Sequence, residues 1–216
     1  MTAVWAVVVA AGSGTRFGTQ KQFEPLGDRR VLDWALDSAR AVAAGVVAVV
    51  PETDAARSEP AADVVVAGGA TRSASVRAGL AAVPDAADVI VVHDAARPLA
   101  PVALFEAVVA AVIGGADGAV PALPVTDTVK QVRGDVVTAT LERSSLVTVQ
   151  TPQAFRAAAL RDAHAAGGDE TDDAALVERA GGRVVVVAGD AANTKLTTPH
   201  DLVLARAVVA GLAGRA

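Results

Sequence analysis

The chain has 216 residues, of which 52% are hydrophobic and 20% are charged, and this balance excludes an intrinsically disordered protein. The absence of cysteine excludes a disulfide scaffold, a thiolate metal site and a cysteine nucleophile. A formal net charge of −5 excludes a globally basic surface for nucleic acid, and charged or glycine residues interrupt every apolar run before it reaches the length of a transmembrane span.

Short valine-rich runs alternate with alanine-rich amphipathic stretches along the chain. Continuous apolar runs of this length are typical of strands that are buried on both faces of a parallel sheet. We expect strands at Val4–Ala10, Val46–Val50, Asp63–Ala67, Val89–His93, Gly118–Pro121 and Val184–Ala188. We expect helices at Val31–Ala43, Arg72–Ala82, Pro101–Ile113, Arg156–Ala166, Asp173–Ala180 and Pro199–Leu212.

This alternation predicts an α/β fold with a Rossmann-like, doubly wound and mostly parallel sheet. Ligands of such sheets bind beyond the C-terminal ends of the strands, where the strand order reverses. We expect residues 1–216 to form a single domain of this kind. Because no basic region precedes the apolar N-terminal stretch, we expect a buried strand there and not a signal peptide. We also expect a cytoplasmic protein that binds neither membrane nor nucleic acid.

One segment, at about 124–150, interrupts the α/β rhythm. The runs Thr128–Val132 and Val136–Thr140 flank Gly134-Asp135, a pair suited to a two-residue type II′ turn, and so predict a β-hairpin. The hairpin has polar faces and little core to sit on, so we expect a β-arm that projects from the domain in which it is inserted. A two-stranded ribbon alone is marginally stable in water. A second copy of the chain is the simplest partner surface, which predicts a homodimer formed through the arm.

The first expected strand leads into a glycine-rich loop that carries two cations. The loop, Ala10–Gln22, has glycines at positions 12, 14 and 18, with Arg16 and Lys21 among them, and no acidic residue precedes Glu24. Backbone N–H groups in such a loop can wrap a polyphosphate, and Arg and Lys supply charge for phosphate oxygens. The alternative is a flexible loop with solvated cations, but the strand, the glycines and the cations together favour a phosphate site.

The same loop departs from two common nucleotide-binding motifs. A dinucleotide fingerprint requires its third glycine at position 17, which is Phe17. A P-loop requires Gly-Lys-Ser/Thr, which the loop lacks. A NAD-binding Rossmann protein is therefore the disfavoured alternative.

Further motifs follow the glycine loop in order: HDAARP (93–98), DTVK (127–130), TPQAF (151–155), ETDDAA (170–175) and NTKLTTPHDL (193–202). The loop itself resembles the signature of the nucleotide-diphospho-sugar transferase superfamily. All the motifs in this order resemble one branch of it, the 2-C-methyl-D-erythritol 4-phosphate cytidylyltransferases of the non-mevalonate isoprenoid pathway. The resemblance covers nearly the whole chain.

The resemblance implies an enzyme that joins CTP and a methylerythritol phosphate and releases pyrophosphate. The substrate phosphate would attack the α-phosphorus of CTP in line, with Mg²⁺ carried mainly by the CTP phosphates and no identified protein ligand. Such a transfer requires positioning and charge neutralisation more than covalent chemistry by the protein. The attacking phosphate is already ionised, so a general base is not required.

The resemblance also assigns roles to residues at the matching positions. The catalytic cations would be Arg16, Lys21 and Lys195. The nucleotide would be bound by Ala10, Ala11, Gly12, Ser13, Gly14, Gly69, Ser75, Asp94 and Ala95. The acceptor would be bound by Arg97, Thr128, Arg143, Thr151, Thr171 and Lys195, with Thr128 and Arg143 reaching the neighbouring subunit's site.

Two positions depart from the family pattern. Relatives often have an acid where this chain has Ala70, and Asp where it has Ala192. These departures bear on the fine contacts to cytosine and to the acceptor, and they leave the cations unchanged. Asp94 and Arg97 also have a simpler interpretation, because they could pair with each other across a turn.

The histidines and one acidic pair have structural interpretations. We expect His93, at the end of a buried strand, to be packed and hydrogen-bonded, and His164 and His200 to be surface or cap residues. Asp172-Asp173 is typical of a helix N-terminus.

Two other functions stay open from the sequence. A cytidylyltransferase for another polyol phosphate, such as ribitol 5-phosphate, would share the nucleotide half of the site. A non-catalytic nucleotide-binding relative would keep the fold and lose the chemistry, but the presence of Arg16, Lys21 and Lys195 together disfavours it.

Overall fold

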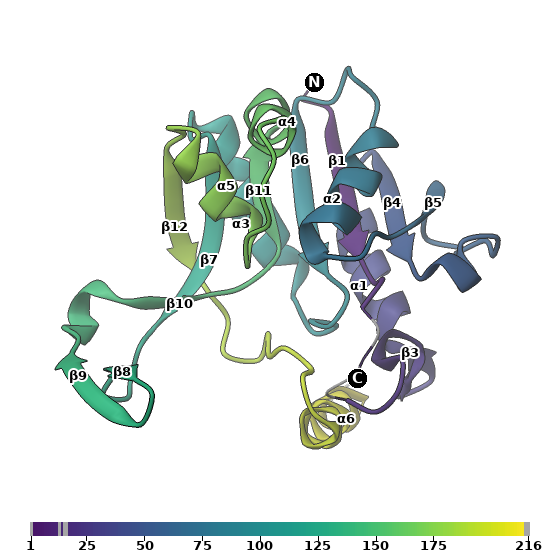
Figure 1. The fold of residues 1–216 in the computed structure, drawn as a ribbon. Coiled ribbons are helices and arrows are strands. Elements are labelled where there is room, and N and C mark those ends of the chain that lie inside the picture. Colours follow the sequence, from purple (N-terminus) through teal and green to yellow (C-terminus); the bar gives the residue numbers. More distant parts are fainter. Residues whose placement is uncertain (1, 13, 15–16, 214–216) are drawn as a thin grey trace.

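A central sheet organises the chain in this computed structural model, which describes residues 2–12, 14 and 17–213 (Figure 1). The strands that run in one direction are β1 (Val4–Val9), β4 (Gly45–Val50), β5 (Val64–Ala67), β6 (Val89–Asp94), β7 (Gly118–Pro124) and β12 (Val184–Ala188). The reversed strands are β10 (Val147–Val149) and β11 (Gln153–Arg156). The order is β10-β7-β11-β6-β1-β4-β5, with β12 also paired to β7. The predicted α/β fold with a mostly parallel sheet is confirmed.

The strand order reverses next to β1. The chain first passes from β1 outward to β4 and β5, and then returns to place β6 on the other side of β1. Val9 at the end of β1 is in register with Asp94 at the end of β6. The two strands therefore deliver their following loops to one point, which is where a doubly wound sheet binds its ligand.

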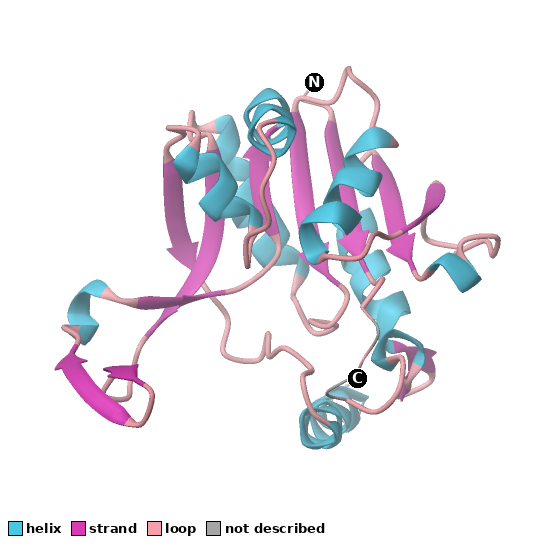
Figure 2. Cartoon of the chain, viewed as in Figure 1, coloured by secondary structure: helices cyan, strands magenta, loops and turns pink. Residues whose placement is uncertain are grey.

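Helices cover both faces of the sheet (Figure 2). One face packs against α1 (Val31–Arg40) and α3 (Val102–Ile113), and the other against α2 (Arg72–Ala81), α4 (Ala157–Ala165) and α5 (Asp173–Arg179). Alternate residues of β1 belong to different apolar clusters, as expected for a strand buried on both sides. Within the described residues, none of these helices has the length and apolar character needed to cross a membrane.

A third apolar cluster lies beyond the C-terminal ends of the strands. Here α6 (Pro199–Ala213) packs near the short β2 (Pro25–Leu26) and β3 (Arg29–Arg30). The cluster includes Phe17 from the glycine loop and Leu196 from the loop before α6. It therefore anchors, from below in Figure 1, the two loops that carry the expected cations.

The sequence did not predict the short strands β2, β3, β10 and β11, although every strand and helix that it predicted is present with small shifts of the ends. Strand β11 has only four residues and leads directly into α4. Its pairing partners, β6 and β7, are distant in sequence. No local periodicity can indicate a strand this short, because its pairing is decided by tertiary contacts.

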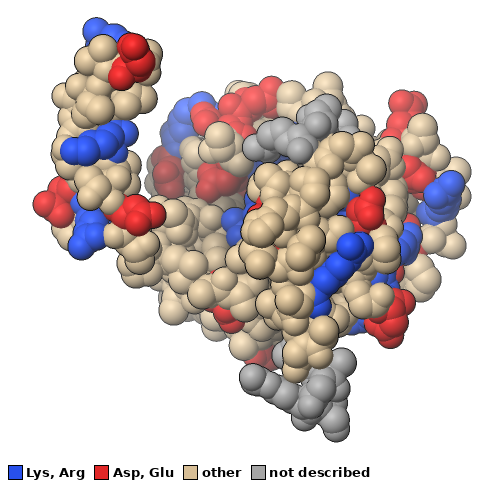
Figure 3. Space-filling view, turned by 90° about the horizontal axis from the view of Figure 1, so that it is seen from below, with Lys and Arg blue, Asp and Glu red and all other residues tan. Residues whose placement is uncertain are grey.

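The predicted arm is present as a separate two-stranded sheet, β8 (Lys130–Arg133) and β9 (Val136–Thr140). The pair closes around Gly134-Asp135, and Gly134 has a φ of +62°, as a II′ turn requires. The arm extends from the body and carries charges of both signs (Figures 1 and 3). Its faces are less polar than expected, because Val132, Val136 and Val137 are 56–61% exposed.

Short 3-10 helices complete the fold: η1 (Lys21–Phe23), η2 (Glu52–Asp54) and η3 (Arg143–Ser145).

Candidate active site

A cavity of about 560 Å³ opens where β1 and β6 end. Its wall is built from the residues that follow β1, from the N-terminal end of α2, from the end of β6, and from two loops that each supply a lysine. The lining residues are Val9, Ala10, Ala11, Gly12, Lys21, Gln22, Gly69, Ala70, Thr71, Arg72, Ser75, Asp94, Ala95, Ala96 and Lys195. The position agrees with the switch point expected from the sequence.

One side of the cavity is made of closely approaching backbone. A Cβ atom on Gly68 would lie 2.2 Å from the Ala11 Cβ, so a side chain at Gly68 would separate the loops after β1 and β5. The Gly69 N–H donates to the Ser75 hydroxyl (3.1 Å), and that hydroxyl donates to the Thr71 carbonyl (3.0 Å). This side therefore presents backbone groups in a fixed arrangement with few bulky side chains.

The glycine loop places Lys21 in the wall of the cavity. The Lys21 ammonium donates to the carbonyl of Leu196 at 2.7 Å, which links the glycine loop to the loop before α6. Gly14 has a φ of +67°, and a Cβ there would lie 1.8 Å from the Thr19 carbonyl oxygen, so Gly14 permits the loop to fold back. Gly14 does not line the cavity.

Two of the predicted loop residues, Ser13 and Arg16, lie outside the described residues.

The sequence analysis did not predict Gln22, which lines the cavity and donates from Nε2 to the Gly12 carbonyl (3.4 Å). The sequence feature that could have identified Gln22 as a cavity residue is its place between Lys21 and Phe23 in the KQF motif.

Asp94 is the carboxylate in the cavity wall, and both of its oxygens are paired with cations. Lys195 Nζ lies 2.7 Å from Oδ2, and Arg72 Nε lies 3.0 Å from Oδ1. Burial alone would raise the pKa of Asp94, but the charges of Arg72 and Lys195 outweigh it and hold that pKa well below its usual range. The carboxylate therefore stays ionised and fixes the Lys195 ammonium at the rim of the cavity.

Asp94 and Arg97 meet across a turn through the backbone, where the Arg97 N–H donates to the Asp94 carbonyl (2.9 Å), but the Asp94 carboxylate pairs with Arg72 and Lys195 and not with the Arg97 side chain. Arg97 donates to the carbonyls of Asn193 (2.7 Å) and Val149 (3.3 Å) and does not line the cavity. Burial of its guanidinium lowers the pKa of Arg97 from its usual value. Arg97 thus holds the backbone just before Lys195 in place.

Arg72 was not anticipated from the sequence, although it follows the glycine pair at the first residue of α2. Besides Asp94, it binds Asp173 through Nη1 at 2.8 Å. Asp173 is fully buried and its other oxygen lies 3.0 Å from His164 Nε2. The expectation that His164 is a surface or cap residue is wrong, because α4 and α5 pack together and bury it between them.

The acidic pair and the other histidines agree with their structural interpretations. Asp172 caps α5 by accepting from the Ala175 N–H. His93 is fully buried, and its Nε2 lies 3.1 Å from the Arg97 carbonyl, which can only accept. His200 lies exposed in the first turn of α6.

The residues expected to bind the acceptor do not meet in the cavity of one chain. The Thr151 hydroxyl is buried, where it accepts from the Asp94 N–H (3.1 Å) and lies 3.1 Å from His93 Nδ1. Thr171 is exposed outside the cavity wall. Thr128 and Arg143 are exposed on the arm, where Arg143 donates to the Thr126 carbonyl.

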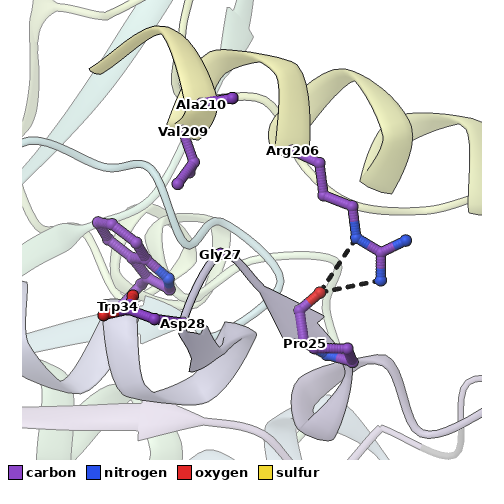
Figure 4. Close-up of a pocket in the computed structure, with 7 residues that line it drawn as sticks. All are labelled: Pro25, Gly27, Asp28, Trp34, Arg206, Val209 and Ala210. Atoms are coloured by element: carbon purple, nitrogen blue, oxygen red, sulfur yellow. Dashed lines mark hydrogen bonds between the residues drawn. The ribbon is translucent and has the colours of Figure 1, made fainter. Parts of the chain in front are cut away.

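A second hollow lies between α6 and the β2–β3 turn (Figure 4). Its volume is about 670 Å³, and it is lined mainly by apolar groups such as Trp34, Val209 and Ala210. Its arginine, Arg206, turns toward the Pro25 carbonyl and donates to it from Nε and Nη2 (3.1 and 2.9 Å). This hollow lacks the converging cations of the first cavity, so the first cavity is the candidate active site.

Comparisons with known proteins agree with this geometry. A family model described as 2-C-methyl-D-erythritol 4-phosphate cytidylyltransferase matches residues 4–211. A protein of that name from Rhodococcus jostii is 50% identical to the chain, and the match covers 95% of each. The crystal structure of 2-C-methyl-D-erythritol 4-phosphate cytidylyltransferase from Thermus thermophilus superimposes with a TM-score of 0.81 at 37% identity, covering 94% of this chain and 97% of that one.

A bifunctional enzyme IspD/IspF from Clavibacter michiganensis is also similar, at 48% identity over 96% of the chain. The match covers 55% of that relative, so the chain spans about half the length of the bifunctional proteins it resembles.

Proposed function

The chain belongs to the 2-C-methyl-D-erythritol 4-phosphate cytidylyltransferase family, and we propose that it transfers a cytidylyl group from CTP to 2-C-methyl-D-erythritol 4-phosphate. The products are 4-diphosphocytidyl-2-C-methyl-D-erythritol and pyrophosphate. The observation that carries this proposal is the cavity at the switch point, whose wall combines the backbone of two glycine-containing loops with Lys21 and Lys195. A nucleoside triphosphate needs this combination of backbone donors and cations.

The reaction is an in-line displacement at the α-phosphorus. An oxygen of the acceptor phosphate forms the new bond, and the bond to the oxygen between the α- and β-phosphorus atoms breaks, so its electron pair leaves with pyrophosphate. Lys21 and Arg16 neutralise the charge that develops on the triphosphate. Lys195, which Asp94 holds at the cavity rim, aligns the acceptor phosphate. The acceptor phosphate is already ionised, so no side chain has to remove a proton.

The backbone side of the cavity suits cytosine. Groups of Ala10, Ala11, Gly12 and Gly69 read the edge of the base, and Ser75 holds Gly69 in place. Ala70 leaves that side without the acid that relatives often carry. CTP should support turnover and UTP should not, and equal rates with the two nucleotides would contradict this choice of base.

Mg²⁺ enters with the nucleotide in this account. Among the described residues, no three His, Cys, Asp or Glu side chains gather into a metal-binding group. The carboxylate of the cavity, Asp94, already pairs with Arg72 and Lys195. These residues fit a metal that would be bound mainly by the CTP phosphates and would neutralise charge on the triphosphate.

The complete site contains residues from two chains. Thr128 and Arg143 are exposed on an arm that extends from the body (Figure 1), which supports a role for them in the acceptor site of another copy. The exposed valines Val132, Val136 and Val137 give the arm an apolar surface for a partner. The chain therefore acts as a homodimer, with residues 1–216 as one nucleotidyltransferase domain.

The acceptor is tested by measuring pyrophosphate release with CTP and either 2-C-methyl-D-erythritol 4-phosphate or ribitol 5-phosphate. Release with the methylerythritol phosphate in large excess over release with the ribitol phosphate is expected. A preference for ribitol 5-phosphate would favour the other cytidylyltransferase, and no release with either acceptor would favour a non-catalytic relative. CTP without an acceptor is the control for background hydrolysis.

The cytoplasmic location stays a prediction, which cell fractionation would check.

A further inference from the structure

A chain of ion pairs, which ends at a buried histidine, joins the cavity to helices α4 and α5. Lys195 Nζ binds one oxygen of Asp94 (2.7 Å), and Arg72 Nε binds the other (3.0 Å). Arg72 Nη1 binds Asp173 (2.8 Å), and the second oxygen of Asp173 lies 3.0 Å from His164 Nε2. We name the set Lys195, Asp94, Arg72 and Asp173 the ion-pair chain.

The ion-pair chain runs from a half-buried lysine in the cavity wall to a fully buried aspartate, and the Asp94 side chain between them is 10% exposed. The Lys195 side chain is 39% exposed, that of Arg72 is 21% exposed, and that of Asp173 is 0% exposed. The members also come from different elements: Asp94 from β6, Arg72 from α2, and Asp173 from α5. A buried charge is costly unless it is paired, so each member restricts the position of the next.

Building on the proposed function, we propose that Arg72 and Asp173 are positioning residues, which orient Asp94 so that its outer oxygen holds the Lys195 ammonium toward the acceptor phosphate. Arg72 has the geometry for this role, because its planar guanidinium donates to two carboxylates in fixed directions at once. Asp173 acts only through Arg72, since it does not line the cavity. Neither residue exchanges a proton or forms a bond to substrate.

The activity test compares Asp173→Asn, Arg72→Lys and Arg72→Met. Asp173→Asn preserves the shape of the side chain and removes its charge, so of the three variants it should disturb folding least. We expect it to lower kcat about three- to thirty-fold. Arg72→Met should lose roughly thirty- to a hundred-fold, and Arg72→Lys, which keeps the charge but not the fork, should fall between. The CTP dissociation constant should change less than about three-fold in each of the three variants. Arg77→Met, in the same helix, is the matched control and should keep wild-type kcat.

The two positions should also be coupled. If Asp173 acts only through Arg72, adding Asp173→Asn to Arg72→Met should cause no further loss of kcat, whereas independent roles would multiply the losses. Weaker CTP binding in the Arg72 variants, with normal kcat in Asp173→Asn, would instead make Arg72 a direct nucleotide ligand and overturn the positioning role.

A spectroscopic readout separates this inference from the proposed function. The lysines of the chain are Lys21, Lys130 and Lys195, so reductive ¹³C-methylation gives few side-chain signals, which Lys→Arg variants assign. In folded Asp173→Asn the Lys195 signal should move while that of Lys130, on the arm, stays in place. This measurement needs no turnover, so it tests the ion-pair chain even if the wild-type protein releases no pyrophosphate and the proposed function fails. An unmoved Lys195 signal together with wild-type kcat in Asp173→Asn would overturn the inference.

Discussion

At the residue scale, we expect the lysines of the cavity wall to contribute more to the reaction than to the stability of the fold. The Lys21 ammonium donates a hydrogen bond to the Leu196 carbonyl, and loss of that bond in Lys21→Ala should lower the free energy of unfolding by about 1–2 kcal/mol. Loss of its charge from the transition state should lower kcat on the order of a hundred-fold at saturating CTP. Steady-state kinetics and urea unfolding measure the two effects. Arg57→Ala removes one positive charge from an exposed side chain outside the cavity wall, so it is the charge-matched control. Near wild-type turnover of Lys21→Ala would contradict the role assigned to Lys21.

His93 gives a second test, on the pH dependence of stability. Burial lowers the pKa of His93 from 6.5 to about 4, so the folded protein keeps this ring neutral while the unfolded chain protonates it. Between these values the unfolded state binds the extra proton, and stability must fall as the pH falls from about 6.5 to about 4. The slope from one such group is at most about 1.4 kcal/mol per pH unit.

The His93→Gln variant should lack this part of the slope, whatever its absolute stability. Urea unfolding at several pH values measures it, and His164 and His200 are present in both proteins, so they cancel in the comparison. Parallel curves for the wild type and the variant would show that His93 is not the buried neutral group described here.

At the element scale, the sequence predicted what depends on local pattern and missed what depends on packing. Valine-rich runs identified the parallel strands, and the glycine loop identified residues that line the cavity. Strand β11 and the buried position of His164 follow from contacts between segments that no local pattern records. Arg72 was missed for the same reason, because its partners Asp94 and Asp173 come from other elements.

Helix α2 offers a test of element packing through a pair of glycines. A Cβ on Gly79 would lie 2.4 Å from Val7 Cγ1, which is fully buried in β1, whereas a Cβ on Gly211 in α6 would meet no atom within 4 Å. Alanine is a better helix former than glycine, so Gly211→Ala should be neutral or stabilising by up to about 1 kcal/mol. Gly79→Ala should lose about 1–3 kcal/mol, because overlap outweighs propensity. Thermal unfolding compares them, and a stabilised Gly79→Ala would contradict the close approach of α2 to the sheet.

At the scale of the whole molecule, the arm predicts that active sites are shared between subunits. Lys21→Ala and Arg143→Ala homodimers should each be inactive, because every site contains one altered residue. After subunit exchange about half of the dimers are mixed, and in each of them one site carries both changes and the other carries neither. Activity should then recover to about a quarter of the wild-type value. Mixtures that exchange subunits, as shown by differently tagged chains, and still stay inactive would mean that each arm serves its own subunit or none.

The central claim is that the α-phosphorus of CTP, and not the γ-phosphorus, moves to the polyol phosphate. It is tested most directly by supplying 2-C-methyl-D-erythritol 4-phosphate with CTP labelled by ³²P at the α position or at the γ position, and separating the products. Label from the α position should appear in the diphosphocytidyl product, and label from the γ position should appear only in pyrophosphate. Label from the γ position in the polyol product, or no label transferred from either nucleotide, would contradict the account.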